Sequence, residues 1–426
     1  MTLQEPGYRP RLLDPIIEQD LRSFGAVNIE GPKWCGKTWT SLAHAESTFF
    51  LMDPDGDFAN RRLAELEPSA VMDGAAPRLL DEWQEVPALW DAVRFHVDRA
   101  GQPGRFLLTG STKPHDKPRH SGIGRIITRQ MRPMSLVESG DSTGAASLTE
   151  LFGGQTLRPV QSDITLEGLI ELAQRGGWPA VVRMHDSDNS GNLARGYIDQ
   201  LVRVDIPQAA GRTFDYTKLR AVIGSLARNT ATLVQIPTIV RDMSQWFGTE
   251  ATEATVRVYL DALRSLYVLE EIPAWSLGLR SSSKLRKSPK RILADPSLAI
   301  AAMGATPATL KADLFTFGFV FESLCLRDLL VYADTIGASV SHYRDDSNLE
   351  ADAIITLRDG RWGAIEIKLG TRQVDDAATN LLRLATKIEA GGHPRPAMLA
   401  VIVGVGGVAQ TRPDGVHVIP VDILGP

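Results

Sequence analysis

The stretch GPKWCGKT, from Gly31 to Thr38, constrains the fold more than any other part of this sequence. A short apolar run, Ala26 to Ile29, ends just before it, and TWTSLAHA after it is typical of the start of a helix. The order strand, glycine-containing loop, helix matches G-x-x-x-x-G-K-[ST], in which loop amides and a helix N-terminus cradle phosphate groups. We therefore expect an α/β fold with a parallel sheet flanked by helices.

Eight consecutive residues of this loop are candidate nucleotide ligands: Gly31, Pro32, Lys33, Trp34, Cys35, Gly36, Lys37 and Thr38. Lys37 would reach the β- and γ-phosphates of ATP, and Thr38 would coordinate Mg²⁺. The metal also needs an acidic residue that ends another apolar strand, and RLLDEWQ supplies it. There Asp81 would organise the metal, while Glu82 would polarise the attacking water as a general base. The alternative is an ordinary solvated Asp–Glu pair at a strand end.

A third apolar strand, RFLLTGST, ends in the hydroxyl side chains of Thr109, Ser111 and Thr112. In a parallel sheet these hydroxyls would lie beside the loop and sense the γ-phosphate, which makes Ser111 a further candidate ligand. Arg125, in GIGRIITRQMRPMSLVE, either belongs to the nucleotide pocket, faces a neighbouring subunit, or is an ordinary surface arginine.

These motifs, followed by GGWPAVV (residues 176–182) and YIDQLVRVDI (residues 197–206), resemble the prokaryotic AAA-type P-loop ATPases that carry a large C-terminal region. The resemblance covers nearly the whole chain. It implies ATP and Mg²⁺ as cofactors and ATP hydrolysis as an activity, and the class as a whole leads us to expect a homo-oligomer. One departure is the third strand, which ends in Ser and Thr where the broader AAA+ class usually has Asn.

The middle of the chain is dominated by helical patterns. Apolar residues at three- and four-residue spacing mark one buried helix face: Val256, Tyr259, Leu260, Leu263 and Leu266. A short helix, a turn at Gly248, this helix and the β-rich tail YVLEEIPAW follow the order of a winged helix-turn-helix. Its Arg257 and Arg264 would contact DNA, but Asp261 and two glutamates on or near the same helix favour a rigid spacer.

The net charge of −5 gives no global attraction to nucleic acid, so such contact needs a local basic patch. The candidate patch is RSSSKLRKSPKR, whose basic residues are Arg280, Lys284, Arg286, Lys287, Lys290 and Arg291. This stretch either touches backbone phosphates or is a solvated linker.

In the last third of the chain, LFTFGFVFESLCLRDLLVYADTIG predicts a long helix. It carries Glu322 among apolar residues, where a lone carboxylate needs a partner. Downstream, LEADAIITLRDGRWGAIEIKLG has a strand-like run on each side of DG, which favours a hairpin. If the turn has three residues, with Gly360 in the left-handed conformation, Leu357 pairs with Arg361.

This register would bring chemically active side chains together. Asp352 would face Glu366, and alternation along the strand would place Glu366 and Lys368 on one face. Metal-assisted phosphodiester cleavage needs two carboxylates to hold Mg²⁺ and a lysine that stabilises charge or helps deprotonate water, and Glu322 would complete the site. The pattern resembles the PD-(D/E)XK restriction-endonuclease-like superfamily, which implies DNA or RNA as substrate. The alternatives are a surface Glu–Lys pair and an inactive relic.

A chain of 426 residues is too long for one core. We expect an AAA-type ATPase domain at residues 1–160, a helical winged-helix domain at 161–280 and an α/β nuclease-like domain at 281–426. No apolar run approaches the roughly 20 residues that span a bilayer, and no secretory signal is visible, so we expect a cytoplasmic protein without membrane contact. Cys35 and Cys325 are too few for a disulfide framework or a zinc cluster.

Two hypotheses about function follow. In the first, ATP binding and hydrolysis control a Mg²⁺-dependent nuclease that acts on nucleic acid. In the second, the protein is a nucleotide-dependent regulatory or DNA-binding switch whose nuclease-like fold binds without cleaving. Cleavage separates the two, because only the first requires Asp352, Glu366 and Lys368 to cut a phosphodiester.

Overall fold

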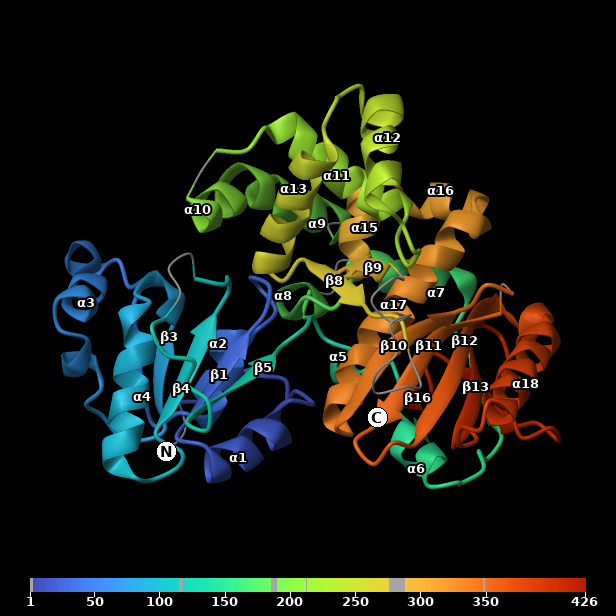
Figure 1. Ribbon diagram of the computed structural model, residues 1–426, viewed down its shortest axis with the longest axis horizontal. Coiled ribbons are helices and arrows are strands. Elements are labelled where there is room, and N and C mark those ends of the chain that lie inside the picture. Colours follow the sequence, from blue (N-terminus) through green and yellow to red (C-terminus); the bar gives the residue numbers. More distant parts are fainter. Residues whose placement is uncertain (1–2, 115–117, 185–189, 212, 276–287, 348) are drawn as a thin grey trace. The chain divides into compact units, whose positions relative to one another are not determined.

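The chain divides into two compact units in the computed structural model (Figure 1). The structure describes residues 3–114, 118–184, 190–211, 213–275, 288–347 and 349–426. The first unit comprises Met1–Pro133, Val204–Thr213 and Asp261–Val268. The second unit comprises Met134–Arg203, Phe214–Leu260 and Leu269–Pro426.

A five-stranded sheet, parallel throughout, forms the centre of the first unit. In order across the sheet, the strands are β2 (Ser47–Phe50), β3 (Arg78–Asp81), β4 (Phe106–Gly110), β1 (Ala26–Glu30) and β5 (Ile126–Gln130). Every residue of β4 is buried, as expected of a central strand covered on both faces. The parallel α/β sheet expected from the sequence is confirmed.

Helices flank this sheet. They are α1 (Asp14–Ser23), α2 (Lys37–His44), α3 (Asp55–Leu66) and α4 (Ala88–Ala100). The short α10 (Ile206–Ala210) belongs to the same unit. Val93 and Val97 of α4 pack in one buried cluster with Leu80 of β3 and Leu108 of β4. A Cβ on Gly25 would lie 2.1 Å from a methyl group of Val97, so glycine lets α4 approach the start of β1 closely.

The helices of the middle region are α9 (Ser190–Gln200), the π-helical turn η4 (Leu201–Asp205), α11 (Tyr216–Arg228), α12 (Ile236–Phe247) and α13 (Glu253–Ser265). Gly248 ends α12 with a φ of 59°, in the left-handed region that favours glycine. After α13, strand β8 (Leu269–Ile272) pairs antiparallel with β9 (Lys290–Leu293). The expected order of helix, turn, helix and β-structure is present, and the winged-helix interpretation stays a prediction.

A seven-stranded mixed sheet forms the core of the second unit. Its order is β10 (Ala338–Arg344), β11 (Glu350–Leu357), β12 (Trp362–Gly370), β13 (Met398–Val405), β15 (His417–Pro420), β14 (Val408–Thr411) and β7 (Val160–Gln161). The other helices of this unit are α5 (Leu136–Ser139), α6 (Leu148–Phe152), α7 (Leu166–Arg175), α8 (Pro179–Val182), α15 (Pro296–Met303), α16 (Pro307–Ala312), α17 (Leu314–Thr335) and α18 (Val374–Ala390). The long helix expected around Glu322 is confirmed as α17.

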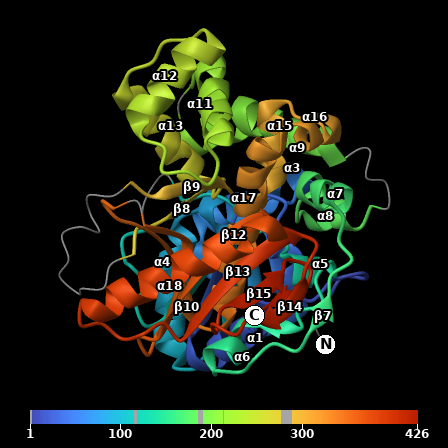
Figure 2. The same cartoon turned by 90° about the vertical axis from the view of Figure 1, so that its right-hand side faces the viewer.

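Helices α17 and α18 cover opposite faces of this sheet (Figure 2). Val401 and Val403 of β13 belong to the buried cluster that includes Leu381 of α18. Gly404 faces the opposite side of β13 from Val401 and Val403, and it lies beside the Phe321 ring of α17. The hairpin β11–β12 therefore lies between two helical layers.

Residues 134–161 belong to the second unit, so the first and longest segment of the first unit ends at Pro133. Within this stretch, β6 (Ala146–Ser147) pairs with β16 (Leu424–Gly425), and β7 pairs with β14. The stretch is held by strand pairing with the C-terminal part of the chain. The expected domain limits stay predictions.

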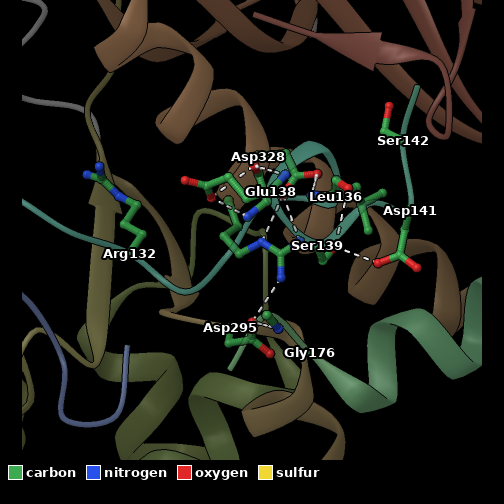
Figure 3. A network of polar contacts seen from close by, with 12 residues as sticks. Arg132, Leu136, Glu138, Ser139, Asp141, Ser142, Gly176, Asp295 and Asp328 are labelled. Atoms are coloured by element: carbon green, nitrogen blue, oxygen red, sulfur yellow. Dashed lines mark hydrogen bonds and ion pairs between the residues drawn. The ribbon is translucent and has the colours of Figure 1, made fainter. Parts of the chain in front are cut away.

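Arg327 of α17 is the centre of a buried polar network in the second unit (Figure 3). Its Nη1 donates to Asp295 Oδ2 at 2.9 Å, and its Nε and Nη2 donate to Asp328 Oδ1 at 2.9 and 2.7 Å. Asp295 also accepts from the Gly177 amide at 2.9 Å, and Asp328 from the Leu136 amide at 3.1 Å. One guanidinium thus ties α17 to the start of α15, to the GGWP stretch and to α5.

The cysteines and the lengths of the helices bear on disulfide bonds and on membrane spans. Cys35 and Cys325 are both free and buried. In the residues that the structure describes, every helix is too short or too polar to cross a membrane.

Candidate functional site

The loop that joins β1 to α2 has the backbone that the glycine motif demands. Gly36 has a φ of 103° and Trp34 a φ of 74°. A Cβ on Gly31 would lie 2.1 Å from the carbonyl oxygen of Met131, so any side chain there would collide with backbone. The loop leads directly into the N-terminus of α2, where unpaired amides and the helix dipole favour an anion.

Lys37 is a buried cation that hydrogen-bonds to neutral groups. Its side chain is 5% exposed and donates to the carbonyl oxygens of Gly31 at 3.0 Å and Pro32 at 2.9 Å. Across the described ranges, no carboxylate lies within ion-pair distance of its ammonium group. Because burying an unpaired charge is costly, this arrangement suits an anion that binds in the loop. Pro32 has no amide hydrogen, so it contributes only its carbonyl group.

Asp81 joins the loop to two neighbouring strands. Its Oδ1 accepts from the Thr38 hydroxyl at 2.9 Å and from the Thr109 hydroxyl at 2.7 Å. Thr109 can reach Asp81 because β4 lies between β1 and β3. Burial raises the pKa of Asp81, and these two hydroxyl donors act in the opposite direction. Thr38 and Asp81 therefore present oxygen ligands side by side, as Mg²⁺ requires.

Glu82 adopts a φ of 59°, which is rare for a residue other than glycine. Its amide donates to the Thr109 hydroxyl at 3.0 Å, and its Oε2 accepts from the Ser111 hydroxyl at 2.7 Å and from the Gln84 amide. Ser111, expected to sense the γ-phosphate, thus holds the carboxylate of Glu82. Nothing in the sequence pointed to Gln84.

Three other residues of the loop direct their side chains elsewhere. Lys33 pairs with Asp205 at 2.8 Å. Cys35 is fully buried, and its Sγ donates to the carbonyl oxygen of Met131 at 3.6 Å. Trp34 is 47% exposed. The Cys35 amide already donates to the Pro32 carbonyl oxygen at 3.4 Å, so the backbone amides of Lys33 and Trp34 are the groups of these three residues that a phosphate group could use.

The arginines that the sequence offered for DNA, nucleotide or subunit contact each have an acidic neighbour. The pairs are Arg125 with Asp98 at 2.7 Å, Arg257 with Glu253 at 3.2 Å and Arg264 with Asp261 at 2.5 Å. Arg125 is half exposed, in agreement with an ordinary surface arginine.

Of the six basic residues at 280–291, the two that the structure describes are buried. Arg280, Lys284, Arg286 and Lys287 lie outside the described residues. Lys290 and Arg291 belong to β9 and are only 7% and 6% exposed. Arg291 donates to Glu271 at 2.7 Å and to the Val234 carbonyl group. The prediction that Lys290 and Arg291 contact nucleic acid is therefore wrong, because both side chains are used inside the protein.

The hairpin β11–β12 has the register that a three-residue turn predicts. Ala353 pairs with Ile365, and the same register sets Asp352 opposite Glu366. Gly360 has a φ of 88°. The three-residue turn and the facing carboxylates are confirmed.

Glu322, Asp352, Glu366 and Lys368 come together in the second unit. Lys368 Nζ lies 2.6 Å from Glu366 Oε2 and 3.8 Å from Asp352 Oδ2. A fifth residue, Lys290, lies between the helix and the hairpin. Its Nζ hydrogen-bonds to Glu322 Oε1 and lies 3.4 Å from Asp352 Oδ1. We call these five side chains the ion cluster.

Burial and mutual repulsion dominate the electrostatics of the ion cluster. Burial first, and then the charge of Asp352, raises the pKa of Glu322 to about 8 and that of Glu366 to about 7. Burial would also raise the pKa of Asp352, but the two lysines and the Ile367 amide, which donates at 2.8 Å, lower it below its usual value. Asn380 of α18 donates to Glu366 at 2.7 Å.

Lys290 and Asn380 were missed in the sequence. The sequence indicates that Glu322 needs a partner, but nothing local singles out Lys290 as that partner, because Lys290 stands in a run of basic residues. Asn380 has no signal of its own, since a polar residue in an amphipathic helix is ordinary.

The two candidate metal sites differ in how well they fit Mg²⁺. Within the described ranges, no group of three or more His, Cys, Asp or Glu side chains is arranged to hold a metal ion. In the ion cluster, Asp352 and Glu366 accept with both oxygens from protein donors. The Mg²⁺ implied for Asp352 and Glu366 does not fit this arrangement, whereas Thr38 and Asp81 fit a metal held together with a bound nucleotide.

Comparison with protein-family models finds an AAA domain at residues 23–139. This match contains every residue of the loop, together with Asp81, Glu82 and Ser111. The sheet of the first unit therefore lies in the part of the chain that matches an AAA domain. Beyond the AAA domain, residues 166–309 match a domain of unknown function, DUF8612, and residues 317–424 match another, DUF4143.

Two curated relatives match most of the chain. They are the uncharacterized proteins Mb2031c of Mycobacterium bovis and Rv2008c of Mycobacterium tuberculosis. Each is 26% identical over 359 residues, which cover 83% of this chain and 72% of the relative.

Solved structures with some likeness include the Walker-type ATPase PABY2304 of Pyrococcus abyssi, at 14% identity and a TM-score of 0.44. That alignment covers 71% of this chain and 97% of the other. A point variant of RuvB from Thermotoga maritima has 14% identity and a TM-score of 0.26, with 61% of this chain and 89% of the other covered. Similarity at this level says nothing about individual residues.

Proposed function

We propose that this protein binds ATP with Mg²⁺ and hydrolyses it at the loop between β1 and α2. The observation that carries the proposal is Lys37, which is buried at the start of α2 and has no ion-pair partner among the carboxylates that the structure describes. The next residue, Thr38, donates a hydrogen bond to Asp81. A site that places a cation and two metal ligands around an anion-binding loop suits a nucleoside triphosphate. When bound, Mg²⁺ would neutralise phosphate charge.

Each residue then has a defined task. Lys37 binds oxygens of the terminal phosphates, and Thr38 and Asp81 hold the metal. Glu82 orients and polarises the attacking water as general base. Ser111 fixes where the Glu82 carboxylate points, since its hydroxyl donates to Oε2.

The test compares ATP binding and hydrolysis in wild type, Lys37→Ala and Glu82→Gln, with Lys311→Ala as matched control. Lys311 is an exposed lysine of the second unit that pairs with Glu167. We expect Lys37→Ala to lose binding of a fluorescent nucleotide. We expect Glu82→Gln to keep binding while the hydrolysis rate falls about 10²- to 10⁴-fold, the usual contribution of a general base. Normal hydrolysis by Lys37→Ala would overturn the proposal.

For the second unit we propose the switch and not the nuclease. Its Glu322, Asp352, Glu366 and Lys368 support a PD-(D/E)XK-like fold, and the resemblance to that superfamily suggests nucleic acid as the partner. Metal-dependent cleavage would also need a metal, and Lys290 lies where a cation would bridge Glu322 and Asp352. We therefore propose that ATP state, in a homo-oligomer, controls binding of nucleic acid without cutting.

Labelled double-stranded DNA, single-stranded DNA and RNA test this second proposal, with Mg²⁺ or Mn²⁺ and with or without ATP. We expect binding that weakens as salt rises and depends on an intact Lys37, with no cleavage. Cleavage that Lys368→Ala abolishes would instead establish the nuclease. Absence of binding to all three would overturn this second proposal.

A further inference from the structure

Lys290 uses its whole hydrogen-bonding capacity inside the ion cluster. A lysine ammonium group has three donors. Those of Lys290 face three oxygens: Glu322 Oε1, Asp352 Oδ1 at 3.4 Å and the Asp352 carbonyl oxygen at 3.2 Å. Its side chain is 8% exposed. The ammonium group thus bridges α17 and β11 from a position surrounded by oxygen, as a bound metal cation would.

Lys290 is also held firmly by its neighbours along the chain. The next residue, Arg291, is buried and donates to Glu271 and to the Val234 carbonyl group. The Arg291 backbone pairs with Thr232 across an isolated bridge, and β9 pairs with β8 over its full length. If the Lys290 side chain left the cluster, either its buried ammonium group would need other hydrogen-bond acceptors or strand β9 would have to shift.

The charge balance points the same way. With all five side chains charged, three carboxylates meet two ammonium groups, so the cluster carries at most one negative charge. Adding a divalent cation while both lysines stay charged would reverse the sign of the cluster and place two cations together. A divalent cation would fit electrostatically only if Lys290 left, because it would then meet three carboxylates and Lys368 alone.

We propose that Lys290 takes the place of the divalent cation, so that the ion cluster joins α17 to the hairpin β11–β12 without binding Mg²⁺ or Mn²⁺. This inference rests on the proposed non-cleaving second unit and is independent of ATP hydrolysis. It assigns Lys290 as the residue that decides whether a nuclease-like arrangement holds a metal.

Mn²⁺ binding to the full chain, without nucleotide or nucleic acid, tests the proposal by titration calorimetry and by the electron paramagnetic resonance signal of free Mn²⁺. Asp352→Asn identifies the binding that belongs to the cluster. We expect Mn²⁺ binding by wild type and by Asp352→Asn to be the same, because the cluster of wild type binds no Mn²⁺. We expect Lys290→Met, which keeps the apolar stem, to bind one Mn²⁺ with an affinity at least tenfold above that of wild type. We expect the double variant Lys290→Met/Asp352→Asn to lose this binding.

Lys368→Met is the matched control, since it removes one positive charge from the same cluster but not from between Glu322 and Asp352. We expect it to gain no comparable Mn²⁺. An equal gain in both variants would overturn the proposal, because any loss of charge would then suffice. Mn²⁺ binding by wild type that Asp352→Asn removes would also overturn the proposal, whatever the variants at position 290 show. That result together with normal ATP hydrolysis and no cleavage would leave the proposed function standing.

Discussion

Replacing Arg327 with methionine should destabilise the second unit by about 3–5 kcal/mol, the usual cost of removing one partner from a buried ion pair. Arg327 is 2% exposed and contacts two carboxylates that are themselves fully buried. Methionine fills part of the volume, so the lost guanidinium charge dominates the effect. Asp295 keeps the Gly177 amide and both donors of Ser297.

Asp328 is the carboxylate that loses most. It accepts both the Nε and Nη2 bonds of Arg327, and without them the Leu136 amide remains on its other oxygen. Burial already raises the pKa of Asp328. We therefore expect Arg327→Met/Asp328→Asn to recover part of the stability lost in Arg327→Met, because the amide carries no charge to bury.

Hydrogen exchange measured peptide by peptide suits this protein, since a chain of two units need not unfold in one step. Peptides from α17 and from residues 134–139 should lose about 10²- to 10³·⁷-fold in protection, the equivalent of 3–5 kcal/mol. Peptides from β1 and β4 are the internal control and should not change. A loss below about 1 kcal/mol, or a double variant less stable than Arg327→Met, would refute the reasoning.

Two further predictions concern single side chains. Thr109→Val removes the hydroxyl that donates to Asp81 and accepts from the Glu82 amide. Since a hydrogen bond to a charged group contributes about 1.5–3 kcal/mol, we expect kcat for ATP to fall about tenfold or more in steady-state assays, with binding of a fluorescent nucleotide retained. Burial lowers the pKa of His417 below its usual value, so the folded state disfavours the proton. The second unit should therefore lose stability as pH falls below about 6.5, and His417→Gln should lose less over the same range in urea unfolding. An unchanged kcat for Thr109→Val, or identical pH profiles for wild type and His417→Gln, would contradict these expectations.

The features that could be predicted from the sequence depend on local rules. The loop from Gly31 to Thr38 carries its own spacing, and the apolar run before it can only enter a sheet. Likewise, a single turn at Gly360 sets the hairpin register, so Asp352 and Glu366 could be placed opposite each other without knowledge of the rest of the fold.

The features that could not be predicted depend on side chains that are distant in the sequence. Lys290 sits in a run of basic residues, and its local surroundings suggest solvent. It is buried because Glu322 and Asp352 lie beside it, 32 and 62 residues away. The bond between Thr109 and Asp81 similarly depends on β4 lying between β1 and β3, an order that no local pattern encodes.

The pairing of residues 134–161 with the C-terminal part of the chain could not be predicted for another reason. Strands β6 and β7 are only two residues long, too short for any periodicity to reveal them. Their partners, β16 and β14, lie near the C-terminus. The domain limit at residue 160 stays a prediction.

The discontinuous first unit has a consequence for biosynthesis. The sheet strands all leave the ribosome before Val204–Thr213 and Asp261–Val268, the two later segments of the same unit. At about 5–20 residues per second, roughly 135 further residues require on the order of 7–27 s after Pro133. For about the first half of that interval the nascent AAA sheet lacks Asp205, the partner of Lys33 in the loop. In a nascent chain stalled in this window, a chaperone would therefore encounter the nucleotide loop before Lys33 has its partner Asp205.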